Sequence, residues 1–436
     1  MYPETARLEQ APSPCFVLDE AKLRRNLQLI DSVQREAGVT IILALKGFSM
    51  FSAFPLVREY LSGATASSLN EIKLVNEYMG VPAHAYVPAY RQDEFDEILR
   101  RSSHVTFNSW TQWEKFKGGK EEREEREERE EREEGGKEEG GKEEGGKGAL
   151  PGQDLEASKA PFPPSSLSSF PPFLPPPFPP SFGIRVNPQY SEVATDMYNP
   201  CVPGSRLGVT RDKLPDTLPA GIEGLHFHTL CENDSFTLER TLAALEEKFG
   251  DLLHQVKWVN MGGGHLMTRE GYDTQHLIGL LKTFREKYDV EIIMEPGSAI
   301  GWQTGVLVST VLDVFDSQGI AVAVLDTSFA AHMPDTLEMP YKPRIRDAYQ
   351  EPVAGKPTYR LGGMTCLAGD FMGDYSFDQP LQVGDRIIFE DMIHYTMVKT
   401  STFNGVNLPA IGIAKEDGTF QLVREYGYES FKDRLS

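Results

Sequence analysis

The sequence predicts an α/β protein, in which a barrel of parallel strands and helices is followed by a domain of antiparallel β strands. Between about residues 20 and 300, short apolar runs that end in polar or glycine-rich loops alternate with amphipathic helical stretches, roughly eight times. After residue 300 the pattern changes to short alternating strands separated by turns. A chain of 436 residues is long enough for two domains with separate cores.

The barrel part begins with an amphipathic helix. Within residues 21–38, four apolar side chains recur at helical spacing, and the fully apolar run 40–45 that follows is typical of a buried parallel strand. The four apolar positions are Leu23, Leu27, Ile30 and Val33. Further helices are expected at 54–63 and 69–80, and further strands at 63–67, 83–89, 104–109, 182–188, 224–230, 258–264 and 290–297.

We expect three divisions of the chain. Residues 20–300 form the barrel (a TIM barrel), residues 301–436 form the β domain, and residues 1–19 add an N-terminal strand to that β domain. Strands of the β domain are expected at 306–315, 320–326, 360–366, 383–390 and 394–405.

Two low-complexity tracts interrupt the barrel between residues 117 and 182. Residues 117–148 use only Gly, Lys, Glu and Arg, which purine codons alone can encode, and residues 161–182 use only Pro, Phe, Ser and Leu, which pyrimidine codons alone can encode. We hypothesise that a GA-rich and a CT-rich tract were translated here, which sequencing of the transcript would test. Such compositions predict a disordered insert.

Composition narrows the class of partner. The net charge of −21 argues against binding to nucleic acid and is compatible with a small cationic substrate. There is no apolar run of about 18 residues, so no membrane-spanning helix is expected. No secretory signal is visible, and four widely spaced cysteines without a CxxC pair indicate reduced thiols in the cytoplasm. They are Cys15, Cys201, Cys231 and Cys366.

Three predicted barrel strands end in residues that could take part in catalysis or bind a ligand. Lys46 would lie at the barrel mouth, where apolar neighbours favour a nucleophilic amine, although an ordinary strand-end lysine is the commoner case. Glycines 262–264 would form a loop of backbone N–H groups suited to phosphate, or a simple tight turn. Glu295 would place a carboxylate at a third strand end, for a pyridine nitrogen or for a helix cap.

Histidine and cysteine side chains add two further candidates. His226 and His228 alternate in a strand and therefore share one face, where one ring could lie flat on a bound ring. No third ligand has suitable spacing, so no metal is expected. Cys366 lies in a glycine-flanked loop, where an exposed thiol can donate a proton, although free cysteines are more often buried and inert.

Taken in order, the motifs ALKGF, ATASSLNEI, RVNP, GSRLG, LHFH, GGG, EPGS, GGMTC and HYTMVKTSTFNG resemble the barrel-type decarboxylases that use pyridoxal 5′-phosphate, including those of ornithine and diaminopimelate. The segments GLHFHTLCE, YNPCVPGSRLG, LDTSFAAHMPD, LEMPYKP and TCLAGDFMGDYSF resemble the branch that acts on carboxynorspermidine and carboxyspermidine. The resemblance covers nearly the whole chain outside residues 117–182.

The resemblance implies a role for each matching position. Lys46 is implied as the Schiff-base lysine, His228 as the ring stacked on the cofactor with His226 second, and Glu295 as the partner of the pyridine nitrogen. Cys366 is implied as the acid that protonates the carbanion, supplied across a head-to-tail homodimer. The implied phosphate-binding set is Gly262, Gly263, Gly264, Ser298 and Tyr395. The implied substrate-binding residues are Asp370, Asp335 and Glu338.

Two departures from the family pattern qualify these roles. Ser298 stands where the ornithine and diaminopimelate enzymes have an arginine, and Leu367 stands where they have an acidic residue. The expected activity is decarboxylation of a carboxylated polyamine to norspermidine or spermidine. Decarboxylation of diaminopimelate or ornithine, an inactive partner-binding paralogue and a racemase remain alternatives, of which Leu367 disfavours the first.

Overall fold

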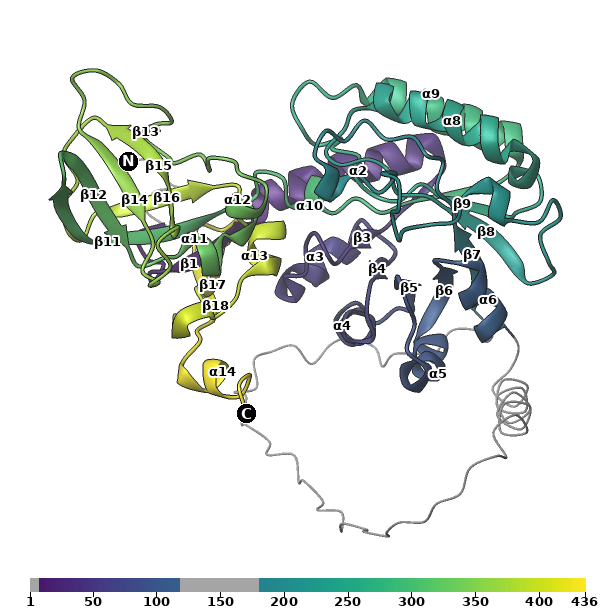
Figure 1. Cartoon of the computed structure of the whole chain (residues 1–436), viewed down its shortest axis with the longest axis horizontal. Helices are drawn as coiled ribbons and strands as arrows, with labels where there is room; N and C mark the ends of the chain where they lie inside the picture. Colours follow the sequence, from purple (N-terminus) through teal and green to yellow (C-terminus); the bar gives the residue numbers. More distant parts are fainter. Residues whose placement is uncertain (1–7, 118–179) are drawn as a thin grey trace, which may run out of the picture.

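The structure, a computed structural model, describes residues 8–117 and 180–436 and consists of two lobes that lie side by side (Figure 1). The predicted insert, 117–182, falls almost entirely outside the described residues. Its last two residues, however, begin strand β7 (Ser181–Arg185), so the barrel sequence resumes slightly earlier than the composition indicates.

The first lobe is a ring of parallel strands, which confirms the predicted barrel. Its first strand is split at Ile42 into β2 (Thr40–Ile41) and β3 (Leu43–Ala44). The first half pairs with β10 and the second half with β4, so that the ring closes. The other strands are β4 (Ala64–Ala66), β5 (Ala83–Tyr86), β6 (Ser102–Phe107), β7, β8 (Ile222–His226), β9 (Trp258–Asn260) and β10 (Glu291–Met294).

Helices cover the outside of this ring. Helix α2 (Glu20–Ala37) begins where the Asp19 carboxylate accepts a hydrogen bond from the Lys22 N–H and ends at Gly38 in the left-handed conformation, and its four predicted apolar positions are buried. The other helices are α3 (Phe54–Arg58), α4 (Leu69–Met79), α5 (Gln92–Arg101), α6 (Trp110–Phe116), α8 (Ser235–Leu253), α9 (Thr274–Tyr288) and α10 (Ser298–Gly301). None of the helices in the described ranges is both long and apolar enough to cross a bilayer.

Trp258 packs across the two neighbouring strands β7 and β8. Its buried indole donates a hydrogen bond from Nε1 to Ser181 Oγ over 2.8 Å. The ring lies directly over Gly183 and Gly224, where an added Cβ would stand 2.2 Å and 2.1 Å from indole carbons. These two glycines are therefore required by packing, because any side chain would occupy the volume of the indole.

We expect Gly224→Ala to destabilise the barrel by about 2 kcal/mol or more, since overpacking of a closed core is costly. Urea unfolding followed by tryptophan fluorescence would measure the loss. Gly279→Ala in α9 is the matched control, because nothing lies within 4 Å of its added Cβ. Equal stability of the two variants would contradict the packing argument.

The second lobe is a sheet whose strand pairs are mostly antiparallel, with parallel pairing of β1 to β17 and of β12 to β14. Its strands are β1 (Cys15–Asp19), β11 (Gly305–Ser317), β12 (Ile320–Leu325), β13 (Ala348–Tyr349), β14 (Thr358–Gly362), β15 (Phe371–Phe377), β16 (Arg386–Glu390), β17 (Ala410–Ala414) and β18 (Phe420–Arg424). The N-terminal strand β1 pairs with β11 and β17.

One predicted strand of this lobe is wrong. Residues 394–405 form helix α13 (Tyr395–Lys399) and a 3₁₀ turn, η4 (Phe403–Gly405). Helical backbone buries the Thr396 side chain, whose hydroxyl donates to Asp335, and turns the Thr400 hydroxyl back to the Thr396 carbonyl. These tertiary contacts override the alternating pattern that indicated a strand.

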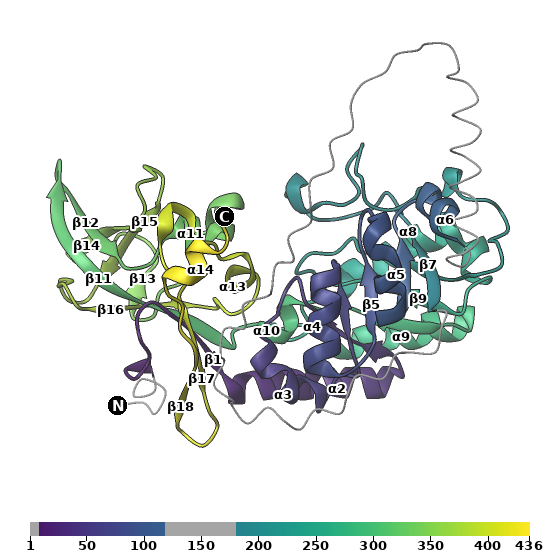
Figure 2. The same cartoon turned by 90° about the horizontal axis from the view of Figure 1, so that it is seen from below.

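The two lobes are joined by β1–α2 and by α10–β11, which lie together at the boundary (Figure 2). The side-chain amide of Asn26, in α2, donates to the carbonyls of Ile300 (3.1 Å) and Trp302 (2.8 Å) and so fastens the second connection to the barrel. We propose residues 20–300 as the barrel domain and residues 1–19 with 301–436 as the β domain.

Candidate active site

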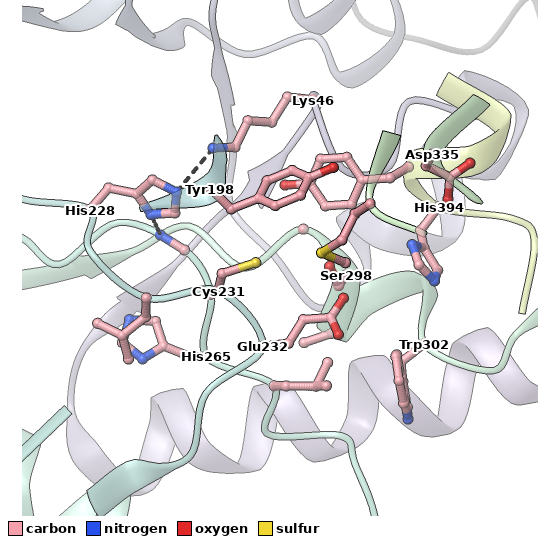
Figure 3. Close-up of a pocket in the computed structure, with 18 of the residues that line it drawn as sticks. Lys46, Tyr198, His228, Cys231, Glu232, His265, Ser298, Trp302, Asp335 and His394 are labelled. Carbon is pink, nitrogen blue, oxygen red and sulfur yellow. Dashed lines mark hydrogen bonds between the residues drawn. The ribbon is translucent and has the colours of Figure 1, made fainter. Parts of the chain in front are cut away.

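A cavity of about 1480 Å³ lies between the carboxyl ends of the barrel strands and the edge of the β lobe (Figure 3). Ligand pockets commonly measure about 300–1,000 Å³, so this one has room for two ligands end to end. Its barrel side is lined by Lys46, Thr65, Tyr86, Arg185, His226, His228, Glu295 and Ser298. Its β-lobe side is lined by Asp335, Tyr341, Arg346, Glu390, Asp391, His394 and Tyr395.

Lys46 follows strand β3 and extends into the cavity. Its Nζ lies 3.1 Å from His228 Nε2. The side chain is accessible from within the cavity, but the surrounding walls limit its hydration, and this desolvation lowers the pKa of Lys46, with a further contribution from the positive charge of Arg185.

The hydrogen bonds of His228 show which protonation state of Lys46 fits the site. The N–H of Gly263 donates to His228 Nδ1 over 2.9 Å, so Nδ1 carries no proton. A neutral imidazole then has its proton on Nε2, the atom that faces Lys46, and donates it to the amine lone pair. Burial lowers the pKa of His228, which favours this neutral ring. This arrangement favours the free-amine form of Lys46, which is the form that attacks a carbonyl carbon.

Glu295 follows strand β10 and is buried. Its Oε1 accepts a hydrogen bond from Asn260 Nδ2 over 2.6 Å, and its Oε2 lies 3.9 Å from His226 Nε2. Burial raises the pKa of Glu295, although the Asn260 hydrogen bond and the charge of Lys46 oppose this shift. A cationic or N–H partner in the cavity would therefore stabilise the negative charge of this buried carboxylate.

The glycine triplet shapes the site through close contacts. An added Cβ at Gly263 would lie 2.4 Å from the Glu295 carbonyl oxygen, and one at Gly264 would lie 2.1 Å from the Leu230 carbonyl oxygen. The Gly262 N–H donates to Asn260 Oδ1, and the Gly263 N–H donates to His228. Gly262 and Gly263 therefore orient the side chains of Asn260 and His228 as well as forming the loop.

Asn260 and Arg185 are site residues that our sequence reasoning missed. Asn260 bridges Glu295 and the glycine loop, and its position two residues before Gly262 was the available signal. Arg185 is buried, donates to the His228 carbonyl over 3.0 Å and lies over the Tyr86 ring. Its signal was the RVNP motif, to which no role was given.

The remaining predicted phosphate-binding residues also line the cavity. Ser298 begins α10 directly after Gly297, and an added Cβ on Gly47 would lie 2.7 Å from Gly297 Cα. The loops that carry Lys46 and Ser298 are therefore in direct contact. Tyr395 reaches the cavity from α13.

Carboxylates gather at the end of the cavity away from Lys46. Figure 3 shows Asp335 and His394 on the side opposite His228, with Glu232 between. Asp335 is 8% exposed, and its Oδ2 accepts hydrogen bonds from Tyr341 and Thr396, each over 2.7 Å. Its Oδ1 has no hydrogen-bond partner among the described residues and lies in the cavity wall.

Four predicted site residues do not line the cavity of the single chain: Gly262, which lies behind the lining residues Gly263 and Gly264 in the glycine loop, and three residues of the β lobe. Cys366 is exposed on the β lobe, where its N–H donates to Asn404 Oδ1. The Asp370 carboxylate is buried and accepts hydrogen bonds from the Ala330 N–H and from the Thr365 N–H and hydroxyl, which hold its loop. Glu338, at the end of α12 (Pro334–Glu338), is ion-paired with Lys399.

Another thiol, that of Cys231, does line the cavity, next to Glu232 (Figure 3). Cys231 is exposed to the cavity, and partial desolvation by the cavity walls, with the neighbouring Glu232 charge, raises the pKa of the thiol and so favours its protonated form. Within the described residues, no three His, Cys, Asp or Glu side chains are placed to hold a metal ion.

Comparison with known proteins identifies the family. Residues 15–393 match the family model described as pyridoxal-dependent decarboxylase, C-terminal sheet domain. The chain is 46% identical to a carboxyaminopropylagmatine decarboxylase of Synechocystis over 99% of this chain and 97% of that protein. It is 38% identical to a carboxynorspermidine/carboxyspermidine decarboxylase of Campylobacter jejuni over 98% and 99% of the two chains.

Solved structures agree with these relatives. A crystal structure of carboxynorspermidine decarboxylase from Campylobacter jejuni, in complex with norspermidine, superposes with a TM-score of 0.78 at 37% identity, covering 97% of this chain and 99% of that one. Diaminopimelate decarboxylase of Helicobacter pylori shares the fold, with a TM-score of 0.71 at 17% identity over 100% of this chain and 99% of that one. The chain therefore belongs to the pyridoxal-dependent decarboxylases with a C-terminal sheet domain, and it is an enzyme that uses pyridoxal phosphate.

Proposed function

We propose that this enzyme removes the α-carboxylate of a carboxylated polyamine, with carboxynorspermidine and carboxyspermidine as the first candidates. The observation that carries the proposal is the layout of the cavity. A free lysine amine and a buried carboxylate lie at one end, and further carboxylates lie at the other end, which suits a long substrate with a cationic tail.

The residues around Lys46 fit pyridoxal phosphate. Lys46 offers an amine for the aldehyde carbon, Glu295 is a buried carboxylate held by Asn260, and glycines 262–264 pack so closely against neighbouring atoms that the loop admits no side chain. Ser298, Tyr395 and the glycine loop are the proposed contacts to phosphate; within the loop the Gly264 N–H is the donor to consider, because those of Gly262 and Gly263 already donate to Asn260 and His228. When bound, the cofactor supplies an electron sink for the pair left on the α-carbon as CO₂ departs.

The protein side chains then have separate tasks. Glu295 keeps a proton on the pyridine nitrogen, because its buried carboxylate is stabilised by an N–H partner. His228 lies beside Lys46 and is proposed to support the ring, with Gly263 fixing its orientation. Lys46 would hold the cofactor covalently between turnovers. Asp335 lines the other end of the cavity, its buried Oδ1 has no hydrogen-bond partner among the described residues, and it is the proposed carboxylate for a substrate cation.

A second candidate substrate is carboxyaminopropylagmatine. The relative named for it is 46% identical to this chain, against 38% for the Campylobacter relative. Carboxyaminopropylagmatine ends in a guanidinium group where carboxynorspermidine ends in an ammonium group, and carboxylates bind both cations.

Measurement of CO₂ release from the three carboxylated polyamines, beside ornithine and diaminopimelate, tests the proposal. The enzyme is expected to turn over at least one carboxylated polyamine far faster than either amino acid. Preference for ornithine or diaminopimelate would overturn it, and inactivity on all five would favour the partner-binding alternative.

We also propose that the functional unit is a head-to-tail homodimer in which Cys366 serves the partner's cavity. Cys366 is surrounded by exposed apolar side chains of a kind that mark an interface. They are Met364, Leu367, Phe371 and Phe403, which are 41–49% exposed. The four free cysteines agree with a reducing compartment, and we propose the cytoplasm.

Cys366→Ala is expected to lower kcat by about 10²–10⁴-fold, the usual contribution of a general acid, while leaving the cofactor bound. Mixing Cys366→Ala with Lys46→Ala protein should restore about a quarter of wild-type activity, because random heterodimers then contain one intact site. Cys231→Ala is the matched thiol variant. Loss of turnover in Cys231→Ala alone, or absence of complementation, would contradict a shared site.

A further inference from the structure

His394 occupies the carboxylate end of the cavity. It is 8% exposed, lines the cavity just before α13 and stacks at 6.2 Å from the Trp302 ring. Its Nε2 lies 3.3 Å from Asp391 Oδ1, within ion-pair distance, and neither Nε2 nor Nδ1 has a partner in hydrogen-bond geometry among the described residues. A buried imidazole with an unpartnered nitrogen in a cavity wall is placed to respond to a ligand.

Three carboxylates from separate parts of the fold surround this ring. Asp391 comes from the turn after β16, Glu232 from the loop after β8 and Asp335 from α12. Burial alone would lower the pKa of His394, but the adjacent Asp391 carboxylate, with the charges of Glu232 and Asp335, raises it above its ordinary value. The empty cavity therefore favours an imidazolium among acids.

Basic side chains line the cavity as well, among them Arg25, Lys342 and Arg344, and three others near the carboxylates have partners of their own. Lys399 is ion-paired with Glu338, and Arg346 with Glu390. Arg269 donates to the backbone carbonyl of Glu232. The cationic partner that the structure places against Asp391 is His394, at 3.3 Å.

We propose that the proton on His394 balances the carboxylate cluster in the empty enzyme and is released to solvent when the far cationic group of the substrate takes its place. This inference rests on the proposed function, since it assigns a task to the cavity end that would receive the tail of the polyamine. His394 acts here as a specificity-determining residue, distant from the bond that breaks.

The direction of the effect follows from linkage. A group that holds a proton in the free enzyme and loses it in the complex makes binding weaker as the pH falls, by about tenfold per pH unit below its free-enzyme pKa. The affinity gained as the pH rises levels off above that pKa. A neutral glutamine has no proton to release, so His394→Gln should bind tightly in the acidic range as well.

The test is calorimetric binding of norspermidine and of aminopropylagmatine to holoenzyme from about pH 6 to about pH 9, where histidine titrates. The titrations of the ligand and of the cofactor are the same for wild type and His394→Gln. The ratio of their two dissociation constants at each pH therefore reports the contribution of His394. We expect His394→Gln to bind at least about tenfold more tightly than wild type at the acidic end and equally at the basic end. His254→Gln, an exposed histidine on the barrel exterior, should behave as wild type.

The outcomes separate this inference from the proposed function. Equal pH dependence in wild type and His394→Gln, or weaker binding by His394→Gln at every pH, would overturn the proton-exchange role while leaving the polyamine substrate standing. Failure of wild type to bind either polyamine, with no CO₂ release from any carboxylated polyamine, would overturn both.

Discussion

Lys46→Ala is expected to abolish covalent attachment of pyridoxal phosphate and to lower kcat by about 10⁴-fold or more, because removal of the covalent nucleophile leaves only binding and electrostatic contributions. Alanine removes the amine that lies 3.1 Å from His228 and adds no steric conflict. The visible absorbance of lysine-bound cofactor, together with borohydride trapping of the cofactor on the protein, measures attachment directly.

Lys257→Ala is the matched control for this change. Lys257 lies before β9, at the other end of the barrel, and is ion-paired with Glu223 on the surface. It should retain full attachment and turnover. Persistence of the lysine-bound absorbance in Lys46→Ala would show that another lysine holds the cofactor.

Glu295→Gln is expected to cost about 10²–10³-fold in kcat, comparable with loss of a preorganised electrostatic partner. The glutamine amide fills the same volume, and its oxygen can still accept from Asn260 Nδ2. What is lost is the negative charge that favours a protonated pyridine nitrogen. Substrate affinity should change little, so kcat and kcat/KM should fall together.

The control for this variant lies on the same strand. Glu291→Gln changes an exposed carboxylate at the start of β10 and should be neutral for both kinetics and stability. The ultraviolet–visible spectrum of the bound cofactor should shift in Glu295→Gln and stay unchanged in Glu291→Gln. An unshifted spectrum with normal kcat would contradict the pairing of Glu295 with the pyridine nitrogen.

The barrel was predictable because its signals are local and repeated. The apolar face of α2 and the strand ends at Lys46, the glycine triplet and Glu295 follow from periodicity and from the turn chemistry beside it. Helix α13 was not predictable in this way. Its residues alternate like a strand, and they become helical because Thr396 is buried against Asp335, a contact that joins distant parts of the sequence.

The candidate site was predictable at the positions where a motif carries chemistry, and much less where side chains act through partners. Asn260 and Arg185 are polar residues inside apolar segments, and only their hydrogen bonds to Glu295 and to the His228 carbonyl reveal a task. Glu338 shows the reverse case. Its sequence position suggested a substrate contact, but Lys399 occupies its carboxylate, so we leave Glu338 and the loop-holding Asp370 out of the proposed substrate site.

The split first strand, which pairs with β10 through one half and with β4 through the other, has a consequence for how the protein folds. Lys46 and Glu295 come from the first and last strands of the barrel, so they meet only after the ends of a long sequence have come together. Such a high contact order predicts slow folding, with cofactor capture as a late step. Pyridoxal phosphate should then act as a ligand of the folded state alone, raising the midpoint of thermal unfolding in proportion to the logarithm of its concentration.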